Sequence, residues 1–396
     1  MSGPLDGVKV LDLTSVLLGP YATQIMGDLG ADVIKIESPA GDTTRQTGVG
    51  RNPGMASFFM GANRNKRSLV LDLKRPAAKE ALWRLIETAD VFVHAIRPKA
   101  IKRLGFGPEA VLSRNPRIVY AGVHGFKEDG PYGNRPAYDD IIQGGSGLSA
   151  LMHRFTGRPM HTPMVTADKT CGLTTAYAIM AALFHRERTG RGQAVEIPML
   201  EVMTSFVLAD HAHGSLFDPP LAPAGYPRVL AQDRRPYETA DGKYLCLLAY
   251  TDAQWRRLFA SVGREELMED PRFCDLMART ANAQPVYAVA AEIIKEKTLA
   301  EWLEIAEEAE LPHMPVNTFE DLPNDPHLAA TGFFAQHEHP TEGDLRLPGI
   351  PTYYSETPGA IRRLQPRLGE HSRQVLAEAG LTEPEIEEAL ANRGSK

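Results

Sequence analysis

The sequence contains few cysteines, and their positions exclude two ways of supporting a fold. Cys171, Cys246 and Cys274 are the only three in 396 residues, and no two of them form a Cys-x-x-Cys pair. Thiols at such spacings build neither a disulfide framework nor a structural zinc site. The scattered histidines also lack ligand partners at convincing spacing. We therefore expect reduced core thiols and no metal.

Positive charge is also in deficit. The 43 Lys and Arg residues against 50 Asp and Glu residues give a net charge of −7. This balance provides no global basic field, so we expect no nucleic-acid partner and expect any anionic ligand to be held locally. The longest uncharged stretch, residues 170–184, is too short to span a bilayer, and the N-terminus lacks a signal pattern. These absences predict a cytoplasmic protein that does not enter a membrane.

The first half of the chain alternates segments typical of strands and helices, and its length allows two or three domains. Strands are predicted at 8–13, 32–37, 68–73, 91–94, 118–123 and 194–197. Helices are predicted between them at 19–29, 76–88 and 168–188, and after the last strand at 199–216. Such alternation favours an α/β fold with a parallel sheet. The helix at 168–188 carries Leu173, Ala176, Ile179, Leu183 and Phe184 at helical spacing, which predicts a buried helix.

The composition changes after the proline-rich segment 217–236, which we interpret as a linker. A short hairpin is predicted at 237–248, and capping boxes at Thr251 and Thr298 predict the starts of two helices. We expect a smaller α+β domain over 237–325. A third capping box, at Thr382, predicts a terminal helix that reaches Arg393.

Several common site motifs are absent. Glu37 ends the second strand of the first βαβ unit, as in dinucleotide-binding proteins, but the turn from Thr14 to Pro20 lacks the GxGxxG pattern. No HExxH, GxSxG, P-loop or EF-hand pattern appears either. The clusters Arg64, Lys66, Arg67 and Arg97, Lys99, Lys102, Arg103 indicate either phosphate binding or solvated charged faces.

Asp168 is the most suggestive single residue. It lies at the start of the predicted buried helix, where free N–H groups and the helix dipole stabilise a carboxylate. By local sequence alone, this position favours a structural N-cap.

Four segments carry a family resemblance: residues 19–37, 63–74, 188–193 and the tail Leu368-Gly-Glu-His371. In content and order they resemble the class III CoA-transferases, the CaiB/BaiF family, which includes formyl-CoA transferases and 2-methylacyl-CoA racemases. The resemblance implies a large Rossmann-like domain built from both chain ends, 1–216 and 326–396, with the smaller domain inserted. It also implies an interlocked homodimer.

The resemblance also implies a mechanism, in which Asp168 matches the family's covalent nucleophile. Its carboxylate attacks an acyl-CoA, and mixed anhydride and aspartyl-CoA intermediates then pass CoA to a carboxylic acid acceptor. We expect the helix N-terminus to keep Asp168 ionised and nearby N–H groups to stabilise the oxyanions. Coenzyme A enters only as part of the acyl-CoA substrate.

Residues that match family positions are expected to bind CoA. They are Val16, Leu17, Leu18, Leu71, Arg103 and His124. Arg45 or Arg64 would bind a second carboxylate of a dicarboxylic substrate, with ordinary surface positions as the alternative. Tyr138 is a further candidate substrate residue.

The chain departs from particular family members. Leu17 replaces a glutamine of formyl-CoA transferases, and no glycine-rich run follows Phe217, which disfavours formyl-CoA:oxalate exchange. Racemases have a histidine where this chain has Tyr138, and an ordinary tyrosine, with a pKa near ~10, is a poor base at neutral pH. The residues therefore favour CoA transfer. A racemase of the same fold and a non-catalytic CoA-binding protein remain the alternatives, and the acyl donor and acceptor stay open.

Overall fold

The computed structural model describes residues 3–391, and its internal contacts divide the chain into two units. One unit combines Met1–Ser149, His161–Phe206 and Ala330–Lys396, and the other combines Ala150–Met160 and Val207–Ala329. Segments from both ends of the chain thus share the first unit. Residues 150–160 and the segment 207–236 group with the second unit.

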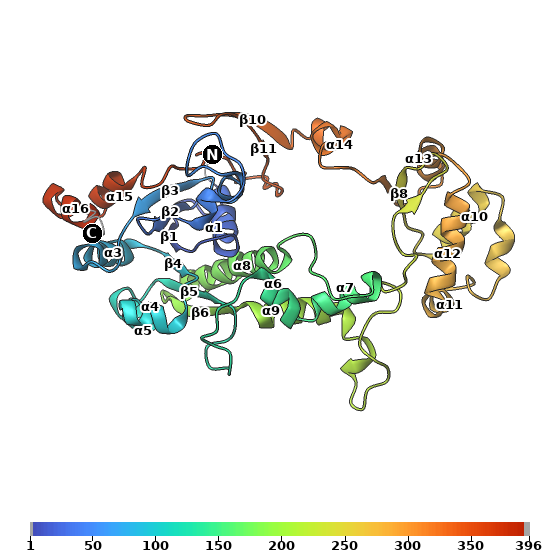
Figure 1. The fold of residues 1–396 in the computed structure, drawn as a ribbon, viewed down its shortest axis with the longest axis horizontal. Coiled ribbons are helices and arrows are strands. Elements are labelled where there is room, and N and C mark those ends of the chain that lie inside the picture. Colours follow the sequence, from blue (N-terminus) through green and yellow to red (C-terminus); the bar gives the residue numbers. More distant parts are fainter. Residues whose placement is uncertain (1–2, 392–396) are drawn as a thin grey trace. The chain divides into compact units, whose positions relative to one another are not determined.

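The first unit contains a six-stranded sheet in the order β3-β2-β1-β4-β5-β6 (Figure 1). Every pairing in it is parallel, which confirms the α/β class. The strands are β1 Lys9–Leu13, β2 Asp32–Glu37, β3 Lys66–Val70, β4 Val91–His94, β5 Val119–His124 and β6 Gln193–Pro198. This is the doubly wound order, in which ligands bind at the carboxyl ends of the strands where the winding reverses, here between β1 and β4.

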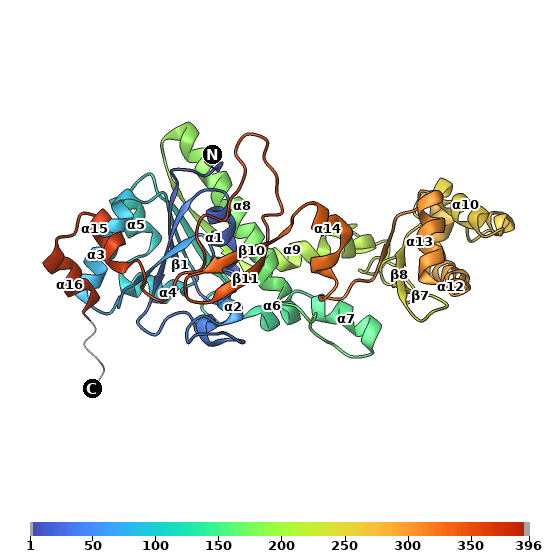
Figure 2. The same ribbon diagram turned by 90° about the horizontal axis from the view of Figure 1, so that it is seen from above.

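Helices cover both faces of this sheet (Figures 1 and 2). One face packs against α3 Pro76–Thr88, α4 Pro98–Leu104, α5 Pro108–Arg114, α15 Ser372–Glu378 and α16 Glu383–Leu390. The other face carries α1 Leu18–Asp28 and α8 Thr166–Thr189. The remaining elements of this unit are η1 Thr43–Gln46, α2 Ser57–Met60, α6 Asp139–Gly145 and the hairpin β10 Phe334–His339 with β11 Gly343–Pro348.

A glycine lets α8 approach the start of α1. A Cβ atom at Gly172 would lie 2.8 Å from the carbonyl oxygen of Leu18, so a larger residue would push the two helices apart. Because Gly172 lies one turn after Asp168, this close packing brings the start of α8 to the loop that follows β1. The position of Asp168 therefore depends on the glycine at position 172.

The second unit has a three-stranded antiparallel sheet and several helices. Its strands are β7 Tyr237–Glu238, β8 Tyr244–Leu247 and β9 His313–Pro315. Its helices are η2 His213–Leu216, α10 Asp252–Ser261, η3 Glu265–Glu269, α11 Leu276–Ala281, α12 Ala283–Ile294, α13 Leu299–Glu308 and η4 Leu322–Asn324. Three helices have residues in both units: α7 Leu148–Thr156, α9 Met199–His211 and α14 Pro326–Ala330.

The three predicted capping boxes are all present. Thr251, Thr298 and Thr382 each begin a helix and exchange hydrogen bonds with the residue three positions later. The last of these helices is α16, which ends at Leu390, and Arg393 lies outside the described residues.

Other local predictions need correction. The strand expected at 68–73 begins two residues earlier, because Lys66 pairs with Val33 inside the sheet. The helix expected at 199–216 ends at His211, before a separate 3-10 turn. Only Cys171 is a core thiol, since Cys246 and Cys274 are exposed.

The predicted buried stripe of α8 is also only partly buried. Ala176, Ile179 and Leu183 are buried as expected, whereas Leu173 and Phe184 are 52% and 65% exposed. Within residues 3–391, no helix is both long enough and apolar enough to cross a membrane.

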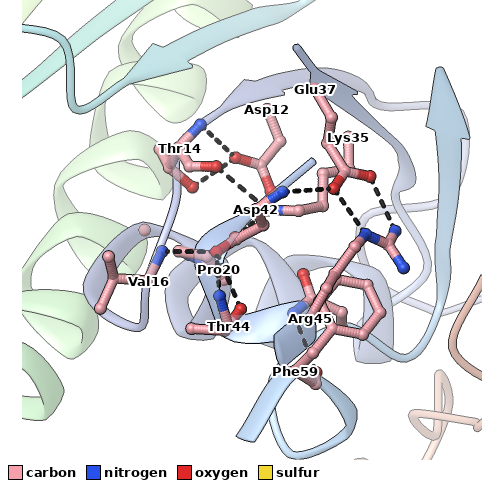
Figure 3. A network of polar contacts seen from close by, with 12 residues as sticks. Asp12, Thr14, Val16, Pro20, Lys35, Glu37, Asp42, Thr44, Arg45 and Phe59 are labelled. Carbon is pink, nitrogen blue, oxygen red and sulfur yellow. Dashed lines mark hydrogen bonds and ion pairs between the residues drawn. The ribbon is translucent and has the colours of Figure 1, made fainter. Parts of the chain in front are cut away.

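Charged side chains are buried between the sheet and α1. Asp12, Lys35 and Lys66 have no solvent exposure. The Lys66 ammonium lies 3.2 Å from Asp12. The Lys35 ammonium lies 2.9 Å from Asp42, and Figure 3 shows these two residues. Burial is the largest single effect and raises the pKa of the Asp12 carboxyl, but the charges of Lys66 and Lys35 and the hydrogen bonds from Thr14 and Thr23 together lower it to about 2. These charges are tolerated in the interior because each faces an opposite charge.

Removal of one partner should therefore be costly. We expect Lys66→Met to lower the free energy of unfolding by about 3 to 5 kcal/mol, because Asp12 then lacks its nearest cation. The matched control is Lys127→Met, which breaks an exposed pair with Asp129 and should cost far less, because solvent screens that pair. Guanidinium denaturation of both variants measures the difference, and equal losses would contradict the assignment.

Candidate active site

A cavity of about 300 Å³ lies at the carboxyl ends of β1, β4 and β5. This is the place where a doubly wound sheet binds its ligands. Its lining comes from the loops after these strands and from the start of α8: Ser15, Val16, Leu18, Thr43, Ala95, Arg97, Pro98, Val123, His124, Gly125, Gly133, Arg135, Pro136, Ala137, Tyr138, Asp168 and Met199. The structure thus brings Asp168 together with four further predicted site residues, Val16, Leu18, His124 and Tyr138.

Asp168 lies in the first turn of α8 but is not its N-cap. The N-cap is Val165, so the expectation of an N-cap aspartate is wrong. Asp168 is only 7% exposed, and its backbone N–H donates to Asp139 Oδ1 over 2.9 Å. That N–H is therefore not free to stabilise an oxyanion. The Asp139 carboxylate also accepts a hydrogen bond from Gln143 Nε2 at 2.6 Å, which holds it against the start of α8.

The environment makes Asp168 a weaker acid than expected. Burial raises the pKa of its carboxyl to about 7, and the negative charges of Asp139 and Asp140 add to the effect. The prediction that the helix N-terminus keeps it ionised is therefore corrected, because burial and two neighbouring carboxylates outweigh the helix dipole. Few interactions stabilise the ionised form of this carboxyl, so its anion is reactive. Groups with shifted pKa values of this kind are typical of functional sites.

The turn after β1 is held in an unusual conformation. Val16 has φ of 68°, which is unfavourable for a β-branched residue. Its N–H donates to Asp42 Oδ1 over 3.2 Å, and Lys35 Nζ donates to the Thr14 carbonyl at 3.0 Å (Figure 3). The buried charges therefore fix this wall of the cavity. Leu18 lines it, whereas Leu17 is buried and does not.

A second cavity, of about 380 Å³, adjoins the first. The two share Ser15 and Thr43, so together they form one extended site. The second is lined by Leu13, Thr14, Ile36, Glu37, Ser38, Gly41, Asp42, Leu71, Asp72, Leu73, Lys74, Ile96 and Leu104 in addition to the shared pair. Leu71 thus lies here, away from Asp168. Arg103 is exposed on α4 beside Leu104 and lines neither cavity.

His124 lies at the end of β5 as a neutral ring. Burial lowers its pKa to about 4. Its Nδ1 atom is buried and makes no hydrogen bond within residues 3–391. Behind it, His94 bonds the Tyr120 hydroxyl at 2.7 Å and accepts the Ile96 N–H. His124 thus lines the cavity as a neutral side chain whose buried Nδ1 atom has no hydrogen-bond partner among the described residues.

Arg45 and Arg64 are not placed to bind a substrate carboxylate. Arg45 forms a buried bidentate pair with Glu37 and lies over the Phe59 ring, and it does not line the cavity (Figure 3). Arg64 forms a buried pair with Asp28 and lines a separate cavity. The expectation for both is corrected, since their guanidinium groups already have anionic partners.

The cation cluster at residues 64–67 is a structural feature for the same reason. Lys66 is paired with Asp12, and Arg67 is paired with Asp32 and Glu378. The phosphate-binding interpretation does not hold for this cluster.

Two cavity residues were missed by the sequence reasoning. Arg97 appeared only as a member of a charge cluster, and Arg135 carried no signal, because a single arginine before a proline has no distinctive pattern. Both are exposed, and neither forms an ion pair with another part of residues 3–391. Among these residues, no three His, Cys, Asp or Glu side chains are grouped to hold a metal ion.

Comparison with known proteins decides the family. The family model for CoA-transferase family III matches residues 5–372. The chain belongs to CoA-transferase family III. Its enzyme class, a CoA-transferase, and the predicted CaiB/BaiF resemblance follow from this match.

Relatives of this CoA-transferase have several substrates in their names. The succinate–glutarate CoA-transferase of Agrobacterium fabrum is 35% identical over 391 residues, covering 95% of each chain. The probable fatty acyl-CoA transferase Rv3272 of Mycobacterium tuberculosis is 32% identical over 388 residues, covering 94% of this chain and 98% of the relative.

Solved structures agree with the fold. The orthorhombic form of Rv3272 has a TM-score of 0.82 at 31% identity and covers 94% of this chain and 99% of the other. A CaiB/BaiF family protein from Brucella suis has a TM-score of 0.78 at 31% identity and covers 96% of this chain and 100% of the other.

The raised pKa of Asp168 predicts a pH dependence for the CoA-transferase. If the ionised carboxylate attacks, kcat/KM should fall as the pH drops below about 7. Asp139→Asn keeps an oxygen for the Asp168 N–H but removes a negative charge, which lowers the pKa of Asp168. We therefore expect the acidic limb of the kcat/KM profile to move to lower pH. The move should be smaller than the whole rise in the pKa of Asp168, because burial is the larger cause of that rise.

The control is Asp140→Asn. The charge of Asp140 raises the pKa of Asp168 less than that of Asp139, so this substitution should move the acidic limb less. Profiles of kcat/KM against pH for the three proteins provide the measurement. A limb that stays in place in Asp139→Asn would show that another group titrates.

Proposed function

We propose that this CoA-transferase moves CoA from an acyl-CoA to a free carboxylic acid through covalent bonds to Asp168. The observation that carries the proposal is the buried Asp168 carboxyl, with its pKa near 7, at the end of a long two-part cavity at the switch point of the sheet. A carboxylate in such a place is suited to attack a thioester delivered by an extended ligand.

The first step breaks the thioester. A carboxylate oxygen of Asp168 attacks the acyl carbonyl carbon, the C–S bond breaks, and CoA leaves as a thiolate. The thiolate then attacks the aspartyl carbonyl of the mixed anhydride. This releases the first carboxylate and forms an aspartyl-CoA thioester.

The second half reverses these steps with the acceptor. The acceptor carboxylate attacks the aspartyl-CoA carbonyl, and the thiolate leaves again. It then attacks the acceptor carbonyl of the new anhydride, which gives the product acyl-CoA and frees the Asp168 carboxylate. No net proton is consumed, so the site needs to hold charge in place and to exclude water.

The two-part cavity orients CoA in this proposal. Lys74 in the second cavity and Arg103 beside it supply cations for the phosphates, and Leu71 and Ile96 supply apolar contacts. The pantetheine arm then passes Ser15, Val16 and Thr43 toward Asp168. His124 lines the same cavity and contacts the thioester end as a neutral ring.

Trapping of the covalent intermediate tests the function directly. Trypsin should release residues 155–169 as one peptide, because Arg158 precedes a proline, and Asp168 is its only carboxylate-bearing side chain. After the enzyme is mixed with succinyl-CoA and quenched in acid, we expect acyl or CoA mass on this peptide. Asp168→Ala should lose the adduct and reduce turnover by at least about 10³-fold, as removal of a covalent nucleophile does.

Cys171 provides the matched control. It is the nearest other nucleophile, but burial raises the pKa of its thiol to about 12, and it falls on the next tryptic peptide. Cys171→Ala should keep both the adduct and turnover. Full turnover in Asp168→Ala would refute the mechanism. Exchange of the α-proton with solvent, without an adduct, would instead identify a racemase. If no acyl-CoA in a panel gave either an adduct or proton exchange, the protein would be a non-catalytic CoA-binding protein.

We further propose that the enzyme is a homodimer, interlocked as in the predicted family architecture. Leu173, Tyr177 and Phe184 lie on one side of α8 by helical spacing, and they are 52%, 61% and 65% exposed. Such an apolar stripe is typical of a surface that a partner covers. A cytoplasmic location stays a prediction.

Sedimentation tests the dimer. We expect twice the chain mass of 43.4 kDa, and we expect Tyr177→Glu to lower the yield of dimer because a charge enters the covered surface. Met277→Glu, at a residue 83% exposed in the other unit, is the control and should leave the mass unchanged. A monomeric wild-type protein would overturn the proposal.

A further inference from the structure

We infer that Arg97 and Arg135 bind the distal carboxylate of a dicarboxylic acyl group, so that the enzyme exchanges CoA between dicarboxylic acids. This inference rests on the proposed function and assigns the substrate class to the same site. It also replaces Arg45 and Arg64, whose buried pairs with Glu37 and Asp28 leave them unavailable.

Both arginines reach the cavity that contains Asp168, from two different loops. Arg97 follows β4 and lies directly before the first residue of α4. Arg135 lies in the segment between β5 and α6. Since β4 and β5 are neighbours in the sheet, the two loops meet at the same edge of the cavity.

The two guanidinium groups are available to a ligand. Neither takes part in an ion pair or a side-chain hydrogen bond with any part of residues 3–391, in contrast to the buried Arg45, Arg64 and Arg67. The Arg135 guanidinium lies 4.1 Å above the centre of the Tyr132 ring. Stacking on an aromatic ring orients the planar group and leaves its N–H donors free.

The charges near Asp168 explain why such a pair would be needed. The reacting carboxyl is close to Asp139 and Asp140, so a second carboxylate on the acyl group would be repelled from the cavity. Two arginines offset this repulsion, and the guanidinium fork matches the geometry of a carboxylate. An acyl group that ends in a methyl group would gain nothing from them.

Phosphate oxygens of CoA have similar chemistry, but the placement disfavours them. Lys74 lies in the second cavity and Arg103 near it, whereas Arg97 and Arg135 line only the cavity of Asp168. If the thioester is at Asp168, the nucleotide end of CoA extends past Ser15 and Thr43 into the other cavity. The arginines are then left with the acyl group.

Succinyl-CoA and butyryl-CoA form a matched pair for the test, since they have the same chain length and differ in a terminal carboxylate against a methyl group. The readout is the second-order rate of adduct formation on the peptide 155–169, which needs no acceptor. We expect the wild-type enzyme to favour succinyl-CoA. Arg97→Met and Arg135→Met should each lower the rate of adduct formation with succinyl-CoA by about 10- to 100-fold, which is the effect of losing a charged hydrogen bond. The rate with butyryl-CoA should change by less than about threefold.

Arg84→Met is the control variant. It removes the same charge from the exposed surface of α3, outside the cavity, and should change neither rate. Arg135→Lys should retain part of the preference for succinyl-CoA, because the charge remains while the planar fork is lost. Unchanged thermal unfolding of each variant would show that the fold is intact.

Other outcomes overturn the inference in distinguishable ways. Equal wild-type rates for the two substrates would refute a dicarboxylate site while adduct formation still supports the proposed function. Parallel losses for both substrates in Arg97→Met and Arg135→Met would show that the arginines hold CoA phosphates instead. No adduct from either acyl-CoA in the wild-type enzyme would refute the proposed function, and the inference with it.

Discussion

The pairing of buried charges beneath the turn after β1 is the interaction on which the site depends. Lys35 and Lys66 lie without exposure between the sheet and α1, and Asp12 and Asp42 are their partners. Charges in such a place are tolerated only when they are paired and hydrogen-bonded, which makes their positions rigid. Through Asp42 and the Thr14 carbonyl, this rigidity reaches the left-handed Val16 and the first residues of α1.

The same region also determines where α8 begins. Gly172 allows α8 to approach Leu18 at the start of α1, so the carboxyl of Asp168 faces the turn that the buried charges hold. Asp139 then contacts the first turn of α8 and adds a negative charge beside Asp168. The site therefore combines an immobile wall with a carboxylate that its surroundings stabilise poorly in the charged form. This combination suits covalent catalysis better than structural capping.

Much of the fold followed from local patterns in the sequence. The alternation of short apolar runs with helical segments predicted all six strands of the sheet, because strands buried on both faces need continuous apolar residues. The capping boxes at Thr251, Thr298 and Thr382 predicted three helix starts, because each box is complete within four residues. The position of Asp168 was predicted to within one helical turn. Its pKa was not, because burial and the charge of Asp139 come from other segments.

The arginines show most clearly what the sequence determined by itself and what it left open. Sequence predicted the strand and helix pattern, the family and Asp168 as the candidate nucleophile, since these depend on contiguous residues. Only the tertiary structure decided that Arg64 pairs with Asp28 and Arg45 with Glu37, while Arg97 and Arg135 line the cavity without an ion pair to any residue that the structure describes. The physical reason is that an arginine looks the same in a sequence whether it is buried or free. Its role is decided by the partner that folding brings within hydrogen-bonding distance.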